Sequence, residues 1–328
     1  MRILITGGAG FIGSHLAERL LAEGHRVTVL DDLSTGRREN LAAMEGDERF
    51  ALVEGDILDR ALVQRLVAQA DTVFHLAAAV GVKLIMEQPS RGILTNVGGT
   101  ENVLLAAAQG GTPVYLASTS EVYGKAARFP FSEDDDLTIG ATVNLRWSYA
   151  SAKQLDEFLA LALARERGLP VVILRFFNTT GPRQSGRYGM VLPNFVQAAL
   201  EGRPLLVHGD GTQSRCFAHV ADAVEALVRL MATPAAIGRV FNIGTDEEIT
   251  IRALAERVIA LTGSDSRIEH VPHEQIYPEG FEDMQRRVPD VSRLQRTIDF
   301  RPRLPLERII TDLIAEKRAG AKRAGAGA

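Results

Sequence analysis

Tyr149 and Lys153 are the two residues whose types and spacing suggest chemistry most directly. They are four residues apart at the start of a stretch with helical periodicity, so both side chains are expected on one face of a helix. A tyrosine hydroxyl has a pKa of about 10 in water, but a neighbouring ammonium group favours the phenolate and lowers that pKa. The pair therefore predicts acid–base chemistry at a substrate hydroxyl, although in isolation the spacing also fits an exposed tyrosine and a solvated lysine.

A glycine-rich turn precedes the first amphipathic stretch. Gly7, Gly10 and Gly13 have the spacing G-x-x-G-x-x-G, which permits a tight turn, close approach of the backbone to a pyrophosphate, and close packing of helix on strand. The N-terminus of the expected helix supplies N–H groups for phosphates. Asp31, at the end of the second apolar segment, can accept hydrogen bonds from ribose hydroxyls and repel a 2′-phosphate. Together these residues predict a dinucleotide site that prefers NAD to NADP.

Short apolar segments alternate with amphipathic stretches through the first half of the chain. This alternation predicts buried parallel strands joined by helices, closing into a doubly wound parallel sheet of the Rossmann type. Turn residues cluster beyond Phe176, where we expect a smaller C-terminal mixed α/β lobe that binds the substrate. We therefore expect a Rossmann domain over 1–175 with a returning strand near 240–243, a second lobe over 176–315, and a flexible tail over 316–328. The apolar segments are 3–5, 27–30, 50–53, 72–76, 114–117 and 171–174.

Composition excludes several classes of function. The formal net charge is −4 without a basic block interleaved with aromatic residues, which argues against a nucleic-acid partner. Cys216 is the only cysteine, so an internal disulfide and a cysteine-cluster metal site are excluded. The apolar run at the N-terminus is too short for a signal peptide or a membrane span. We expect a cytoplasmic enzyme with no bound metal and no membrane partner.

Two further segments fit a cofactor groove. Asp56 ends the third apolar segment, where its carboxylate can meet an adenine amine, and the small residues 76–78 let a cofactor lie against the backbone. His75 ends the fourth segment. We interpret it as a packed histidine rather than as a catalytic base.

These motifs together resemble the extended short-chain dehydrogenase/reductase family, which contains nucleotide-sugar epimerases, dehydratases and decarboxylases. The resemblance covers nearly the whole chain, including 31–36, 116–124, 175–178, 181–183 and 209–217. It implies NAD-dependent oxidation of a UDP-sugar at C4 and a second lobe that binds the nucleotide sugar. It also implies that the residues binding cofactor include Phe11, Ile12, Asp32, Ser34, Thr35, Gly36, Ile57, Leu76, Ala77, Ala78, Asn96 and Ser118, beside Tyr149 and Lys153.

The resemblance also assigns the substrate contacts. Thr119 would hold the sugar 4-hydroxyl beside Tyr149, and Asn178 and Arg215 would bind the diphosphate through amide and guanidinium donors. The alternatives are a turn-forming amide for Asn178 and a surface ion pair for Arg215. Further substrate-binding residues implied are Lys83, Ser120, Val191, His208 and Gln213.

Glu121 and Arg287 bear on which reaction follows oxidation at C4. Ser120-Glu121 resembles the pattern of UDP-glucuronate decarboxylases, whereas dehydratases carry Asp-Glu there and simple 4-epimerases a small residue in place of the glutamate. Arg287 resembles the arginine of the decarboxylase R-x-P motif. A β-keto acid loses carbon dioxide readily because the ketone stores the developing charge. Glu121 could organise a water or repel the departing carboxylate, and Arg287 could anchor or protonate. The alternatives are a helix-start carboxylate and a surface arginine.

Met190 and the segment 81–89 favour a different outcome. Decarboxylases usually have an arginine where Met190 stands, and both features look more like the UDP-glucuronate 4-epimerases. A UDP-glucose 4-epimerase is also left open. We place a UDP-xylose-forming UDP-glucuronate decarboxylase first, because a buried glutamate facing the sugar is unfavourable without a chemical role. A non-catalytic dinucleotide sensor is disfavoured by the presence of Thr119, Tyr149 and Lys153.

We expect a homodimer. The resemblance implies that two helices per subunit, here 99–109 and 149–165, pack as a four-helix bundle. Their apolar residues seem to exceed what one face within a subunit needs. These residues are Val103, Leu104, Leu155, Phe158 and Leu159.

Overall fold

The centre of the protein is a seven-stranded parallel sheet, with strand order β11-β6-β5-β4-β1-β2-β3. The computed structural model describes residues 1–81, 87–186, 190–272, 275–276, 282 and 284–326. Every pairing in this sheet is parallel, which confirms the predicted doubly wound architecture. The strands are β1 (Arg2–Thr6), β2 (Arg26–Asp31), β3 (Phe50–Glu54), β4 (Thr72–His75), β5 (Val114–Thr119), β6 (Val171–Phe176) and β11 (Arg239–Ile243).

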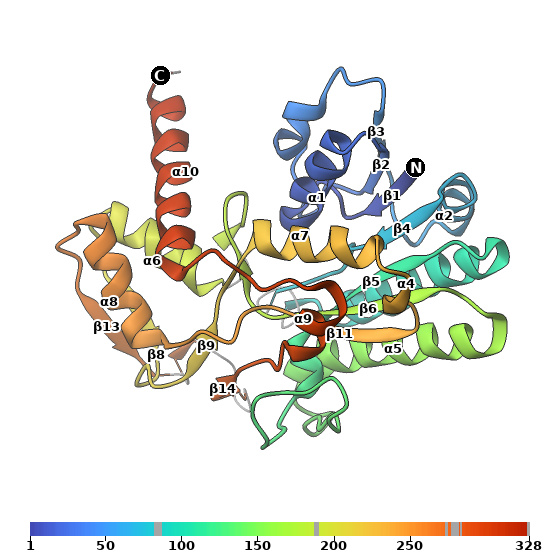
Figure 1. The fold of residues 1–328 in the computed structure, drawn as a ribbon. Helices are drawn as coiled ribbons and strands as arrows, with labels where there is room; N and C mark the ends of the chain where they lie inside the picture. The colour runs from blue at the N-terminus through green and yellow to red at the C-terminus, as the bar shows by residue number, and fades with distance from the viewer. Residues whose placement is uncertain (82–86, 187–189, 273–274, 277–281, 283, 327–328) are drawn as a thin grey trace.

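Helices cover both faces of this sheet (Figure 1). One face packs against α1 (Phe11–Ala22), α7 (Val220–Met231) and α9 (Ser292–Ile298), and the other against α2 (Arg60–Val67), α4 (Pro89–Gly110) and α5 (Ser148–Arg167). Side chains alternate between the two cores along each strand: Ile3 and Ile5 enter one, Leu4 the other. Because both faces are buried, the strands appear in the sequence as continuous apolar runs. Truncating Leu4 to alanine would cost about 2–5 kcal/mol.

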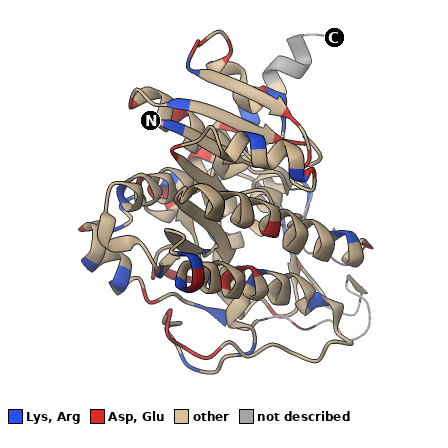
Figure 2. Ribbon diagram, turned by 90° about the vertical axis from the view of Figure 1, so that its right-hand side faces the viewer, with Lys and Arg blue, Asp and Glu red and all other residues tan. Residues whose placement is uncertain are grey.

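The smaller lobe has its own apolar core beneath three helices. These are α6 (Val191–Leu200), α8 (Ile251–Thr262) and α10 (Leu306–Ala326). Short sheets lie beside them: β8 (Leu205–His208) with β13 (Ile268–Val271), β9 (Ser214–Cys216) between β12 (Glu248–Thr250) and β14 (Arg286–Arg287), and β7 (Thr179–Thr180) with β10 (Ala218–His219). Acidic and basic side chains are distributed along the helices and loops (Figure 2).

The chain passes between the two lobes more often than a single boundary near 176 implies. After β10 it returns as α7, which packs on α1, and as β11, which pairs with β6. The outer edge of β11 is covered by side chains. Asn242 N donates to Glu133 Oε1 at 3.0 Å, and Arg293 Nη1 donates to Val240 O at 3.3 Å.

The C-terminal residues differ from the expected flexible tail over 316–328. Helix α10 continues through them as far as Ala326. The reason lies in their composition, because alanine, lysine, arginine and glutamate all have high helix propensity. Among the described residues, no helix combines the length and apolarity needed to cross a membrane.

Candidate functional site

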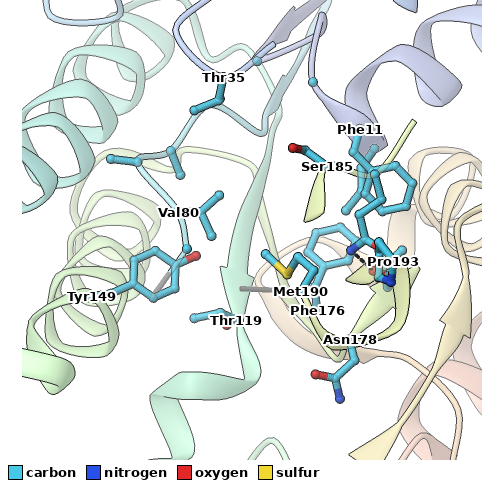
Figure 3. Close-up of a pocket in the computed structure, with 18 of the residues that line it drawn as sticks. Phe11, Thr35, Val80, Thr119, Tyr149, Phe176, Asn178, Ser185, Met190 and Pro193 are labelled. Carbon is cyan, nitrogen blue, oxygen red and sulfur yellow. Dashed lines mark hydrogen bonds between the residues drawn. The ribbon is translucent and has the colours of Figure 1, made fainter. Parts of the chain in front are cut away.

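A cavity of about 1110 Å³ lies where the carboxyl ends of β1, β2, β4, β5 and β6 face the smaller lobe. In doubly wound sheets, ligands bind at this edge. Figure 3 shows Thr119 and Tyr149 on one side of the space, and Asn178, Met190 and Pro193 on the other. The lining combines apolar walls with a few polar groups, as is typical of a small-molecule site.

The glycine turn lines one end of the cavity and can take a pyrophosphate. Gly7 has φ +71°, a left-handed conformation that favours glycine, and its N–H donates to Leu30 O at 2.8 Å. A Cβ at Gly7 would lie 2.7 Å from Ala77 N, and one at Gly13 only 2.4 Å from Gly7 O. Larger residues would therefore displace the backbone that forms the cradle. This close packing and the helix N-terminus beside it fit a dinucleotide.

Asp31 is fixed at the end of β2 by two backbone donors. Its carboxylate accepts from Ala9 N and from Leu33 N, both at 2.9 Å. Burial raises the pKa of Asp31, while these two hydrogen bonds oppose that change. The aspartate lines the cavity, as do Gly7, Gly10, Phe11, Ile12, Gly13, Asp32, Ser34, Thr35, Asp56, Ile57, Leu76, Ala77, Ala78 and Ser118 among the predicted cofactor residues.

Three predicted cofactor residues do not line the cavity. Asn96 is buried behind the wall, where its Oδ1 accepts from Ala79 N at 2.7 Å and its Nδ2 donates to Ala79 O at 3.1 Å. Its role in the structure is to hold the loop after β4. Gly36 lies behind Asp31, and Lys153 is enclosed by α4 and α5. Lys83 lies outside the described residues.

Tyr149 and Thr119 meet where α5 begins and β5 ends. Burial raises the pKa of Tyr149, and the charges of Glu121 and Asp156 raise it further. A hydrogen bond with Thr119 and the positive charge of Arg146 act in the opposite direction. Without an additional cation, Tyr149 is therefore protonated at neutral pH. Its activation requires a further positive charge in the cavity, which the nicotinamide ring of bound NAD provides.

Lys153 is held by a buried chain of hydrogen bonds, here called the lysine network. Lys153 Nζ lies 2.8 Å from Asp156 Oδ2, which also accepts from Thr100 Oγ1 at 3.0 Å. Thr100 Oγ1 lies 3.1 Å from His75 Nε2, and His75 Nδ1 lies 2.7 Å from Thr6 Oγ1. Asp156 and Thr100 were not predicted, since charged and hydroxyl groups on a helix are usually solvated.

The lysine network has one consistent direction. Burial lowers the pKa of His75 to about 3, so the ring is neutral and carries one N–H. Thr100 has a single hydroxyl hydrogen, which it gives to Asp156, so His75 Nε2 must donate to Thr100 and His75 Nδ1 must accept from Thr6. The interpretation of His75 as a packed residue is confirmed.

Glu121 is clamped between two arginines. Its Oε1 accepts from Arg287 Nη1 at 2.6 Å, and its Oε2 forms an ion pair with Arg146 Nη2 at 2.5 Å. Burial alone raises the pKa of Glu121, but the charges of Arg287, Arg146 and Arg215 outweigh it and lower the value to about 2. Glu121 is therefore a permanent carboxylate. Arg146 was missed from the sequence, although it stands three residues before Tyr149.

The smaller lobe contributes the remaining predicted side chains. Arg215 on β9 is the register partner of Arg287 on β14, so two arginines lie side by side on neighbouring strands. Asn178, with φ +30°, donates through Nδ2 to Cys216 O at 3.0 Å while also lining the cavity. The predicted substrate residues Ser120, Val191, His208 and Gln213 line it too.

A second buried ion pair fixes α5 against the sheet. Glu157 Oε2 lies 2.7 Å from Arg175 Nη2 on β6, and Glu157 Oε1 accepts from Ser118 Oγ on β5 at 2.5 Å. Since Tyr149 is on α5 and Thr119 on β5, this contact sets the distance between them.

The chain belongs to the NAD dependent epimerase/dehydratase family, whose model matches residues 3–244. It is 48% identical over 314 residues to a UDP-N-acetyl-alpha-D-glucosaminuronate decarboxylase of Bacillus cytotoxicus, covering 95% of this chain and 96% of that protein. It is 38% identical over 306 residues to UDP-glucuronic acid decarboxylase 1 of Danio rerio, covering 93% and 70%.

A solved structure of similar fold is UDP-glucuronic acid 4-epimerase from Bacillus cereus in complex with UDP-glucuronic acid and NAD. The match has a TM-score of 0.88 at 27% identity and covers 97% of this chain and 99% of that one. These comparisons confirm the expected family resemblance and the NAD cofactor.

Proposed function

We propose that the protein is an NAD-dependent UDP-hexuronate decarboxylase that oxidises the sugar at C4 and releases C6 as carbon dioxide. The observation that carries this proposal is Glu121, held as a carboxylate between Arg146 and Arg287 in the cavity that contains Thr119 and Tyr149. A buried charged cluster beside the reacting hydroxyl serves no purpose in a site for a neutral sugar. The decarboxylases that the chain resembles support the same conclusion.

In the first step Tyr149 takes the proton of the sugar 4-hydroxyl, which Thr119 orients. NAD, when bound, accepts hydrogen from C4 and later returns it, and residues 1–175 together with β11 form its binding domain. Lys153 supplies a fixed positive charge behind the tyrosine, because Asp156 and the lysine network prevent its side chain from turning away. The nucleotide and diphosphate would lie in the smaller lobe, against Asn178 and Arg215.

In the second step the C5–C6 bond breaks. Its electron pair forms an enolate with the C4 ketone, and C5 then takes a proton. Glu121 cannot donate that proton, since its pKa is about 2. Its negative charge instead disfavours the bound carboxylate relative to neutral carbon dioxide and can orient the water that protonates C5. Arg287 keeps Glu121 in place.

The substrate candidates are UDP-glucuronate, which would give UDP-xylose, and its 2-acetamido analogue. They differ only at C2. UDP-glucuronate is the substrate predicted from the sequence, and the identity of 48% to the B. cytotoxicus enzyme favours testing the acetamido sugar in parallel.

The test uses both UDP-hexuronates labelled with ¹³C at C6, with UDP-glucose as the neutral comparison, and follows products by NMR. We expect labelled carbon dioxide and a UDP-pentose from at least one hexuronate. Glu121→Gln should slow release of the label far more than reduction of NAD. Glu248→Gln is the matched control, because Glu248 pairs with Arg286 outside the cavity.

A 4-epimerase is the second candidate, favoured by Met190, which lines the cavity at the start of α6. In that case the product would keep all its carbons and differ only at C4. Retention of the label with inversion at C4 would refute the decarboxylase proposal.

We also propose a homodimer formed through α4 and α5. Leu155, Phe158 and Leu161 of α5 are exposed, as are Ile93 and Leu94 of α4. The expectation was wrong for Val103 and Leu104, which are fully buried in the core against the sheet, because they lie on the inner face of α4. The cytoplasmic location stays a prediction.

A further inference from the structure

We propose that Arg146 selects the substrate by binding the carboxylate at C6 of the sugar, and that Glu121 occupies its guanidinium until the substrate arrives. This inference rests on the proposed function, since it concerns the hexuronate carboxylate. It adds a specificity-determining residue on the large lobe.

The position of Arg146 is set by the element that leads into α5. The 3₁₀ turn η3 (Leu145–Trp147) places it three residues before Tyr149. Its side chain is only 3% exposed to solvent but lines the cavity, with Nη2 2.5 Å from Glu121 Oε2. The next residue anchors the turn, because Trp147 is buried and its Nε1 donates to Glu282 Oε2 at 2.8 Å. The Arg146 guanidinium lies 5.5 Å from the Trp147 ring centroid, a favourable cation–π distance.

Arg146 is close to where the carboxylate of a bound hexuronate must lie. C6 is attached to C5, which is the neighbour of C4, and C4 reacts at Tyr149. The carboxylate is therefore confined to the surroundings of Tyr149, where the charge of Arg146 is felt strongly enough to lower the pKa of that tyrosine. A planar guanidinium binds carboxylates through paired N–H donors, which a water-filled pocket does not offer.

The local charges favour a second carboxylate. Two guanidinium groups, Arg146 and Arg287, converge on the single carboxylate of Glu121. The cluster therefore has an excess positive charge, and a buried charge is stabilised by a partner of opposite sign. A hexuronate supplies that partner at C6, whereas a neutral hexose supplies a hydroxymethyl group.

Arg146 and Arg287 differ in what they can control. Arg287 reaches the cluster from β14 in the smaller lobe, while Arg146 precedes the helix that carries Tyr149 and Lys153. A carboxylate bound to Arg146 is consequently held at a fixed position relative to the base at C4. This links recognition of the acid group to orientation of the 4-hydroxyl.

The experiment measures binding by calorimetry to the NAD-saturated protein. Its probes are UDP, UDP-glucuronate with UDP-glucose, and the 2-acetamido uronate with UDP-N-acetylglucosamine. For at least one pair, the wild type should bind the uronate roughly tenfold to a hundredfold more tightly than the neutral sugar, as expected for a charge-assisted contact. Arg146→Gln should abolish most of that ratio while leaving the affinity for UDP unchanged.

Two variants guard against misinterpretation. Arg146→Lys keeps the charge but loses the planar fork, so it should retain part of the ratio, and it decides the question if Arg146→Gln fails to bind NAD. Arg286→Gln is the matched control, since Arg286 adjoins Arg287 but pairs with Glu248 outside the cavity, and it should behave as wild type. An unchanged ratio in Arg146→Gln, even with reduced turnover, would mean that Arg146 only positions Glu121 and would overturn the inference. Absence of decarboxylation by the wild type would refute the proposed function separately.

Discussion

Lys153 and Asp156 form an ion pair almost completely withdrawn from solvent, with Nζ and Oδ2 2.8 Å apart and side chains 2% and 1% exposed. Two charges leave water only if hydrogen bonds compensate, and Thr100 provides one of them. Through His75 the same network reaches Thr6, the residue before the glycine turn at Gly7. The redox pair and the expected phosphate site are therefore connected by a single buried chain.

Asp156→Asn should move the pH–rate profile. The negative charge of Asp156 raises the pKa of Tyr149, so its removal lowers that pKa. Because the base must be deprotonated, the limb of the profile that rises with pH should shift to lower pH. The variant should also lose about 3–5 kcal/mol of stability, measured by urea unfolding, because Lys153 is left buried without its partner. Thr100→Val keeps both charges and should leave the profile in place. An unshifted profile in Asp156→Asn would contradict the assignment.

Tyr149→Phe should reduce turnover by roughly 10²–10⁴, the usual contribution of a general acid–base group. Only one hydroxyl is removed, so affinity for NAD should persist, which fluorescence titration can measure. Tyr115→Phe is a suitable control, since Tyr115 is buried in β5 outside the cavity with its hydroxyl directed to Met231 O. Full activity in Tyr149→Phe would show that another base acts.

The wild-type protein should bind NAD more tightly than NADP, because the Asp31 carboxylate would face the 2′-phosphate. Asp31→Asn removes the charge with little change of shape and should narrow the difference in dissociation constants. Asp47→Asn, at an exposed position before β3, should leave the difference unchanged. Equal affinities in the wild type would refute the preference.

Phe158→Asp should convert the proposed homodimer to a monomer. Phe158 is 69% exposed in the single chain, so the substitution removes no internal packing, and a charge there would be buried without a partner in the interface. Light scattering at micromolar concentration measures the mass. Leu206→Asp, which also replaces an exposed apolar residue but in the smaller lobe, should leave the mass unchanged. A monomeric wild type would exclude the proposal.

The parts of the fold that local patterns determine could be predicted, and those that depend on contacts between distant elements could not. The strand containing Ile3 and Ile5 was recognisable because both faces of the sheet are buried. Glu157 gave no such indication, because its partner Arg175 comes from another element and meets it only after α5 has packed on the sheet.

The candidate site divides in the same way. The glycine turn and the Tyr149–Lys153 spacing are local motifs. The clamp around Glu121 joins η2 (Ser120–Tyr123), η3 and β14, so only the resemblance indicated Arg287 and nothing indicated Arg146. The tail over 316–328 was misjudged because its repetitive composition was interpreted as disorder, although the same residues favour a helix.

The late position of β11 in the sequence has a consequence for how the protein is made. Until residues 239–243 leave the ribosome, the edge of β6 lacks its neighbour, and an open strand edge is a template for aggregation. Once β11 is in place, its own edge is covered by the side chains of Glu133 and Arg293. A fragment that ends after β6 would thus retain the glycine turn, Tyr149 and Lys153 and still be prone to precipitate. Shortening the enzyme to its cofactor-binding segment is therefore not a route to a soluble protein.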